Sequence, residues 1–243
     1  MKIGRWQGCV LGGAVLWAAA TGGALAAPAT TAAPALKLGE AGYYQAPGVN
    51  WLVFSNWYDG LFADSKISGV ELIQQGVRTA TNGDVRLSAT PGQWDPIAAL
   101  VSRTVDAKTG TIEAVLEYKD YGFRYRIRAD PRGSAMALSV TLDQPVPAAL
   151  AGKAGLNLEF LPSAYFHKSF MVDGRGGTFP IYPAGDMVTT PERNAASGRN
   201  TGPGAEPRPI AEGRRFVLAP EDAGRRVTVQ ASAGSIAMFD GRN

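Results

Sequence analysis

The chain has 243 residues, of which 45% are hydrophobic, and a formal net charge of +3. Cleavage of the leader described below would leave 22 basic and 21 acidic residues. With no Lys/Arg patch interleaved with aromatic residues, this balance excludes a nucleic-acid partner. The single cysteine, Cys9, lies in that leader, which excludes disulfides, cysteine catalysis and zinc–thiolate sites in the mature chain.

Residues 1–26 have the pattern of a secretory signal peptide. Lys2 and Arg5 give it a positive start, and residues 9–16 form an apolar segment too short to span a bilayer. Residues 24–26 form an A-x-A cleavage site, although an uncleaved anchor remains the alternative. We therefore predict an exported protein, periplasmic or secreted, with no membrane span after cleavage.

Residues 27–37 are small and rich in Pro and Thr, which predicts a flexible linker. Residues 38–243 then contain many short period-two runs separated by turn signals. This pattern predicts an all-β domain, a large antiparallel β-sandwich of a supersandwich-like kind. The chain ends directly after an apolar strand, SIAMFDGRN, which favours a domain truncated at its C-terminus.

Three parts of this domain carry specific expectations. Asn82-Gly83 stands between two short runs and predicts a two-residue hairpin. Residues 112–142 predict a three-stranded meander in which Glu113, Glu117 and the arginines of FRYRIRA share an exposed face. Those arginines then either form cross-strand ion pairs or bind an anion. Residues 183–213 show no period and predict a long loop.

His167 is the only histidine, and Glu159 and Asp173 lie near it in the sequence. A histidine flanked by carboxylates can act as a general acid or base. However, the chain contains no G-x-S-x-G and no H-E-x-x-H motif. A structural histidine, hydrogen-bonded within its turn, therefore stays open as the alternative.

Other candidate sites come from carboxylates and aromatic rings in the loops. The pairs Asp59/Asp64 and Asp173/Asp186 are candidate couples for glycoside hydrolysis. No spacing of oxygen ligands is diagnostic of calcium, so we predict no metal and no cofactor. Exposed rings can stack on sugars or anchor a core. The residues that we expect to bind carbohydrate are Trp57, Tyr58, Trp94, Tyr165 and His167.

Four segments, GVELIQQGVRTATNGDVRL, TPGQWDP, GLNLEFLPSAYFHKSFM and FPIYPAG, resemble the N-terminal β-sandwich region of secreted bacterial glycoside hydrolases of family 9, which are cellulase-like. The resemblance covers residues 38–243. It implies a catalytic (α/α)-barrel elsewhere, because this chain has neither that family's Asp-Ala-Gly-Asp type motif nor enough helix. No catalytic residue can therefore be carried over to any position here.

Three functions follow as hypotheses. In the first, the chain is the accessory sandwich of an exported enzyme that degrades polysaccharide such as β-glucan, and it supports a separate or missing catalytic domain or binds carbohydrate. In the second, it is a complete carbohydrate-active enzyme that uses His167 with Glu159 or Asp173. In the third, it is a non-enzymatic envelope module that contacts a partner through residues 183–213.

Overall fold

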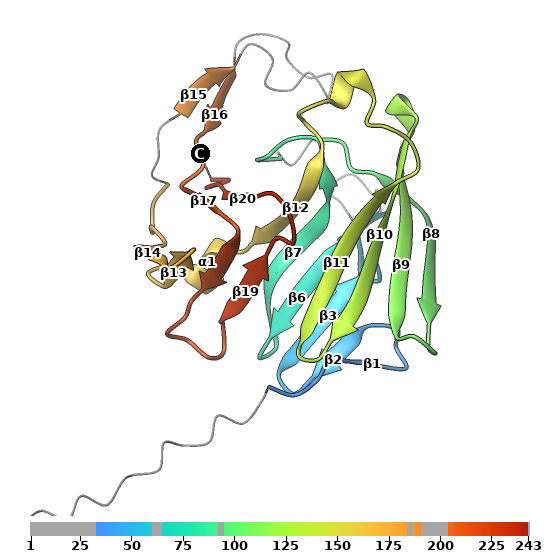
Figure 1. Cartoon of the computed structure of the whole chain (residues 1–243), viewed down its shortest axis with the longest axis horizontal. Helices are drawn as coiled ribbons and strands as arrows, with labels where there is room; N and C mark the ends of the chain where they lie inside the picture. Colours follow the sequence, from blue (N-terminus) through green and yellow to red (C-terminus); the bar gives the residue numbers. More distant parts are fainter. Residues whose placement is uncertain (1–32, 60–64, 92–94, 184–186, 191–203, 243) are drawn as a thin grey trace, which may run out of the picture. The chain divides into compact units, whose positions relative to one another are not determined.

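The computed structural model describes residues 33–59, 65–91, 95–183, 187–190 and 204–242. Within these ranges the fold is mostly β, with several antiparallel sheets and one short helix, in a β-sandwich-like architecture (Figure 1). The predicted signal peptide lies outside the described residues. None of the described helices is long and apolar enough to cross a membrane.

The largest sheet has six strands in the order β1-β2-β3-β6-β7-β12. Neighbouring strands in it are antiparallel. It begins inside the predicted linker, because Lys37 is already paired and Leu36 is buried in the core. Its strands are β1 (Lys37–Leu38), β2 (Tyr44–Ala46), β3 (Val49–Val53), β6 (Val70–Gln74), β7 (Val77–Arg86) and β12 (Gly155–Phe160).

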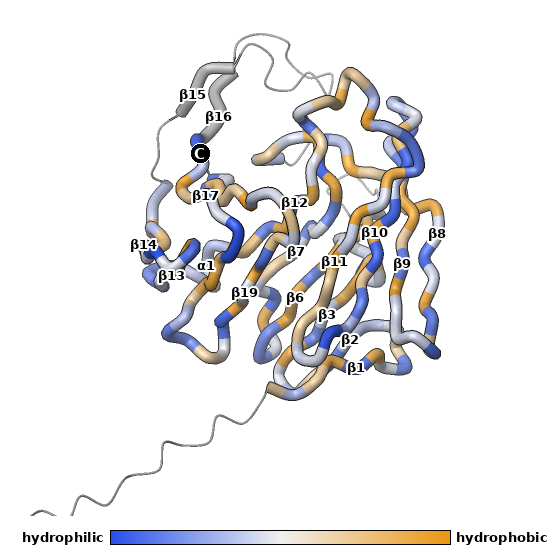
Figure 2. The backbone as a smooth tube through the Cα atoms, in the orientation of Figure 1, coloured by the Kyte–Doolittle hydropathy of each residue, from blue (hydrophilic) through white to orange (hydrophobic). Residues whose placement is uncertain are grey.

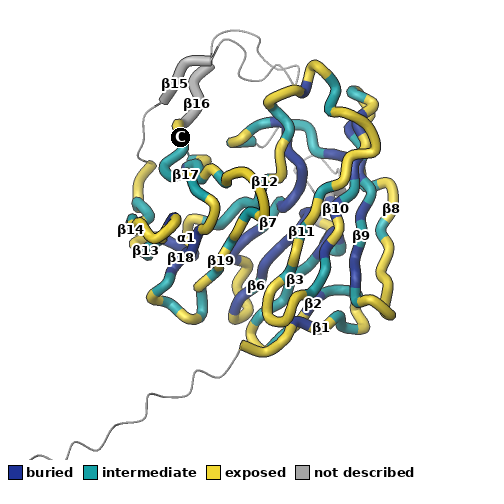
Figure 3. The backbone as a smooth tube through the Cα atoms, viewed as in Figure 1, coloured by how far each residue is buried: buried dark blue, intermediate teal, exposed yellow. Residues whose placement is uncertain are grey.

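A four-stranded sheet shares the main hydrophobic core with this six-stranded sheet. Its order is β11-β10-β9-β8, and the last three strands along the chain form the predicted meander. Inward-facing side chains such as Phe123, Tyr125 and Ile127 alternate with polar ones, so one face is buried (Figure 3). The strands are β8 (Ala99–Asp106), β9 (Thr111–Tyr118), β10 (Phe123–Arg132) and β11 (Ala135–Leu142), with two 3-10 turns at Lys119–Tyr121 and Ala148–Leu150.

A second hydrophobic cluster lies under the third sheet, whose order is β14-β13-β18-β19. The short helix α1 (Pro162–Tyr165) contributes Ala164 and Tyr165 to this cluster. The third sheet and the two-stranded pairs consist of β13 (Ser169–Val172), β14 (Arg175–Thr178), β18 (Arg215–Leu218), β19 (Val227–Gln230), β4 (Trp57–Asp59), β5 (Ser65–Ile67), β15 (Met187–Thr190), β16 (Gly204–Pro207), β17 (Ala211–Gly213) and β20 (Ile236–Met238).

The predicted hairpin at Asn82-Gly83 is wrong, because β7 continues through both residues. The chain turns instead at Gln75-Gly76, where φ is 51° and 74°, as a tight hairpin turn requires. Asn82 has φ 52° beside a register irregularity of β7. Gly83 is needed for close packing, since an added Cβ would lie 2.6 Å from Cβ of Val70.

The predicted loop over residues 183–213 is also only partly a loop. β15 and β16 pair with each other, and β17 (Ala211–Gly213) forms the end of this segment. Strands of three or four residues carry too few side chains to show a period in the sequence. Their pairing is therefore a property of the folded chain and could not be recognised from local pattern.

The exposed face of the four-stranded sheet carries ion pairs, and one of them, between Arg124 and Glu117, is a cross-strand pair of the kind that one predicted alternative expects. Arg124 lies 3.2 Å from Glu117, its partner on β9, and Arg126 and Arg128 lie 2.9 Å from Asp143 and Asp130. Figure 2 shows hydrophilic and hydrophobic residues alternating along β10. These arginines therefore already have carboxylate partners on the sheet.

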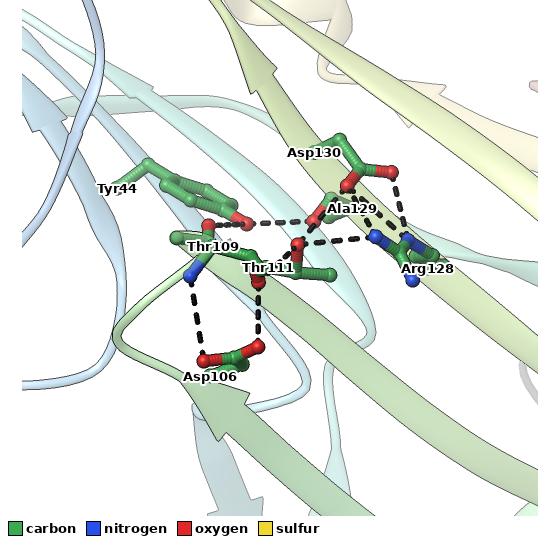
Figure 4. Close-up of polar contacts among 8 residues, drawn as sticks. Tyr44, Asp106, Thr109, Thr111, Arg128, Ala129 and Asp130 are labelled. Carbon is green, nitrogen blue, oxygen red and sulfur yellow. Dashed lines mark hydrogen bonds and ion pairs between the residues drawn. The ribbon is translucent and has the colours of Figure 1, made fainter.

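Tyr44 connects the two large sheets at the end of the core (Figure 4). Its hydroxyl lies 2.7 Å from the carbonyl oxygen of Ala129 on β10 and 2.9 Å from that of Gly110. Nearby, Thr111 donates to Asp130, which also binds Arg128. The ring of Tyr44 is fully buried, so these polar groups depend on each other for hydrogen bonds.

We expect Tyr44→Phe to lower the free energy of unfolding by about 1–3 kcal/mol, because it removes the donor for a buried carbonyl oxygen. Urea denaturation measures this change. The control is Tyr43→Phe, since Tyr43 is only partly buried and its loss should stay within about 0.5 kcal/mol. Equal losses in the two variants would argue against the buried hydrogen bond.

Candidate functional site

The three residues predicted for acid–base chemistry lie in different local settings. His167 follows α1 with φ 59° and an exposed side chain. Asp173, at φ 47° between β13 and β14, accepts hydrogen bonds from the backbone N–H groups of Arg214 and Arg215 at 2.9–3.2 Å. These bonds lower the pKa of Asp173. The carboxylate of Asp173 therefore fixes the start of β18.

Glu159 lies on β12, where its carboxylate accepts a hydrogen bond from Asn82 at 2.7 Å. Its other oxygen lies 3.8 Å from Nη1 of Arg86. Among the described residues, no hydrogen bond or ion pair joins His167 to Glu159 or to Asp173. The structure thus places Glu159 in a polar network on the six-stranded sheet, and His167 in the turn between α1 and β13.

The predicted carbohydrate-stacking rings fall into different classes. Trp57 is 57% exposed on β4, and Tyr58 is placed by its backbone on the same strand. Trp94 lies outside the described residues, as do Asp64 and Asp186. Tyr165 is 2% exposed and packs against Phe160 and Phe179 at ring distances of 5.8 and 5.7 Å.

Tyr165 is therefore a core residue and not a stacking surface. Its hydroxyl donates to the carbonyl of Arg225 at 3.3 Å, and burial raises its pKa to about 12. A ring enclosed in this way has no free face for a sugar. The four residues of α1 are too few to show from the sequence that Tyr165 turns inward.

The six-stranded sheet carries a group of hydrogen-bonding side chains that we call the polar row. It is centred on Glu71, whose side chain is fully buried. Glu71 accepts hydrogen bonds from Asn56 at 2.6 Å and Thr81 at 2.8 Å, and Nε of Arg78 lies 2.9 Å away. The polar row consists of Asn56, Glu71, Arg78, Thr81, Asn82, Arg86 and Glu159.

The two carboxylates of the polar row, Glu71 and Glu159, accept hydrogen bonds from neighbouring residues of β7, Thr81 and Asn82. Thr81 donates to Glu71, and Thr81 is also the cross-strand partner of Glu159. The Glu159 side chain is 35% exposed and that of Arg78 is 48% exposed. The polar row is thus buried at Glu71 and reaches solvent through Glu159 and the guanidinium of Arg78.

Trp57 lies one residue along the chain from Asn56, the amide that binds Glu71. Asn56 is held further, because its carbonyl accepts hydrogen bonds from the backbone and side chain of Ser68 at 3.0 and 2.9 Å. An exposed indole is therefore attached to a fixed end of the polar row. Such a combination of planar polar groups and an aromatic face suits a polyhydroxylated ligand.

A buried titratable group, Asp84, lies on the same strand. Its carboxylate accepts a hydrogen bond from the Tyr125 hydroxyl at 2.7 Å, and burial raises its pKa to about 7. Arg86, two residues on, is 6% exposed. Its Nε has no hydrogen-bond partner among the described residues. β7 therefore carries an acid and a base, both buried, two residues apart.

Sequence reasoning found Glu159 and Trp57 but missed Glu71, Arg78 and Asn82 as members of one site. The available signal was Glu71 itself, a charged residue among apolar neighbours in VELIQ, where a buried strand favours apolar side chains. Across the described ranges, no three His, Cys, Asp or Glu side chains are grouped as metal ligands.

Comparisons with protein-family models, with curated proteins and with solved structures give no match to this chain.

Proposed function

We propose that this chain is an exported module that binds carbohydrate, folded over residues 38–243 as one large, supersandwich-like β-sandwich. It serves a glycoside hydrolase that degrades polysaccharide, and a catalytic domain outside this chain performs the hydrolysis. The sequence supports export through its leader, and the family resemblance supports the link to β-glucan. Of the hypotheses drawn from sequence, this accessory role fits the geometry best.

The observation that carries the proposal is the polar row, with the exposed Trp57 next to its member Asn56 in the chain. Sugar hydroxyls both donate and accept hydrogen bonds, and the accessible part of the row offers a carboxylate, an amide and a guanidinium. The exposed Trp57 face can stack on the C–H groups of a sugar ring. By contrast, no described contact brings His167 to a carboxylate, so the enzyme hypothesis has less support.

We expect the purified chain to bind a soluble β-glucan and Trp57→Ala to weaken that binding about tenfold, because a stacked ring contributes roughly 1 kcal/mol or more. Glu159→Gln should weaken it several-fold, while Glu117→Gln on the other sheet should leave it unchanged. Isothermal titration calorimetry measures the three affinities, and thermal melting checks that each variant folds.

The same samples test the accessory role. Incubation with the glucan should release no reducing ends, because the proposal places hydrolysis in another domain. Release that depends on His167 would establish the enzyme hypothesis instead. Absence of any binding to β-glucans, xylan or mannan would contradict the carbohydrate-binding role.

A further inference from the structure

An open pocket of about 470 Å³ lies where three separate segments meet. These segments are the β6–β7 turn, helix α1 with the residues after it, and the turn between β18 and β19. Its lining includes Gln75, Val77, Ser163, Lys168, Asp222 and Arg225. This volume is within the range of small-molecule sites. None of these residues belongs to the polar row.

Hydrogen bonds tie the walls of the pocket to each other. Arg225 donates from Nη1 to the carbonyl of Gln74 at 3.0 Å, and Gln74 donates back to the carbonyl of Arg226 at 3.3 Å. Tyr165 of α1 donates to the carbonyl of Arg225. The pocket is therefore built by contacts between elements about 150 residues apart in the sequence, and its shape exists before any ligand binds.

The charged groups that line the pocket already have partners within the protein. Nζ of Lys168 lies 2.6 Å from Oδ2 of Asp222, and their side chains are 29% and 31% exposed. Arg225, the other base of the lining, donates to the carbonyl oxygens of Gln74 and Gly224 at 3.0 and 3.1 Å. Because each of these charges is engaged by a protein group, the lining suits a neutral ligand better than an ionic one.

The same groups offer donors and acceptors side by side. Lys168 keeps donors beyond the one given to Asp222, and the Ser163 hydroxyl and Gln75 amide each provide both functions. Oδ1 of Asp222 also accepts a hydrogen bond from the backbone N–H of Gly224 at 2.9 Å. Val77 and Ala164 supply small apolar surface. This mixture matches a ring that presents hydroxyl groups at its edge and C–H groups on its face.

We infer that this pocket binds one neutral sugar ring and is a second carbohydrate site, separate from the polar row. The choice of sugar as ligand rests on the proposed function. The location rests on the pocket's own residues, so the two claims can fail independently. Lys168 and Asp222 act as a pair that holds a hydroxyl from both sides, and Ser163 is part of the same lining.

The test titrates the full mature chain with D-glucose and cellobiose, followed by NMR chemical shifts and calorimetry. Ser163→Tyr fills the pocket with a side chain and removes no hydrogen bond that the structure shows, so sugar binding there should fall about tenfold or more. Lys168→Met keeps the aliphatic stem and removes the donors, with a similar loss. Lys108→Met, on an exposed turn, should change nothing.

The outcomes separate this site from the proposed function. If Ser163→Tyr and Lys168→Met lose the shifts of glucose while Trp57→Ala retains them, the pocket is a site of its own. If all binding follows Trp57 and neither pocket variant matters, the inference is overturned and the proposed function stands. If glucuronate or inorganic phosphate binds here and glucose does not, the pocket takes acidic ligands and the inference is also overturned.

Discussion

At pH 8, Asp84→Asn is expected to raise the free energy of unfolding by about 2–4 kcal/mol relative to the unchanged chain. The Asp84 side chain lies at the boundary of the main core, 7% exposed, with its pKa raised to about 7 chiefly by burial. In an unfolded chain an aspartate has a pKa near 3.9. The folded state therefore keeps the proton of Asp84 up to a pH about three units higher than the unfolded state does.

The direction of the pH dependence follows from this difference. Below about pH 4 both states are protonated and the folded state keeps its full stability. Between about pH 4 and pH 7 the unfolded state is ionised first, so stability falls by up to roughly 1.4 kcal/mol per pH unit. The introduced amide keeps an oxygen for the Tyr125 hydroxyl and carries no charge, so this fall disappears.

Urea denaturation of both proteins from pH 4 to pH 8 measures the effect. Asp173→Asn is the matched control, because backbone hydrogen bonds lower the pKa of Asp173 and its contribution is lost only as pH falls below about 4. Between pH 4 and pH 8 the Asp84→Asn substitution should therefore remove the fall in stability, whereas Asp173→Asn should leave the pH dependence unchanged. Parallel curves for Asp84→Asn and the unchanged chain would show that Asp84 does not titrate between pH 4 and pH 7.

The second large effect is expected at the buried end of the polar row. Glu71→Ala should cost about 3–5 kcal/mol of unfolding free energy, because removing one partner of a buried ionic network leaves the others unsatisfied. Asn56, Thr81 and Arg78 all direct donors at this carboxylate. Because three donors would lose the same acceptor, we expect removal of Glu71 to cost more than removal of one partner of a surface ion pair.

Glu71→Gln distinguishes hydrogen bonding from charge. The introduced amide keeps one acceptor, and the Asn56 amide can rotate to accept from it, so the loss should be about 1–2 kcal/mol. Glu117→Ala, which breaks the exposed pair with Arg124, should cost no more than about 1 kcal/mol. A Glu71→Ala loss as small as that of Glu117→Ala would mean that the network does not depend on its carboxylate.

The sequence alone determined the mostly β character and the position of its most regular strands. In residues 112–142 the apolar residues alternate with charged ones, and the structure confirms β9, β10 and β11 with their predicted exposed face. The prediction of these strands succeeded because successive side chains of a strand point to opposite faces. A half-buried strand therefore shows a period-two alternation of apolar and polar residues in its sequence.

Tertiary structure decided the features that depend on contacts between distant segments. Asn82-Gly83 has the local chemistry of a hairpin, yet packing of Gly83 against Val70 places it inside β7. Two residues close in sequence likewise differ in burial, since the side chain of Tyr165 is buried and that of His167 is exposed. Glu71 and Glu159 meet in one polar row through β7, whose Thr81 donates to Glu71 and whose Asn82 donates to Glu159, because β7 lies between β6 and β12. Local sequence records which face of a strand is apolar, whereas which strands become neighbours is set by the long-range burial of those faces.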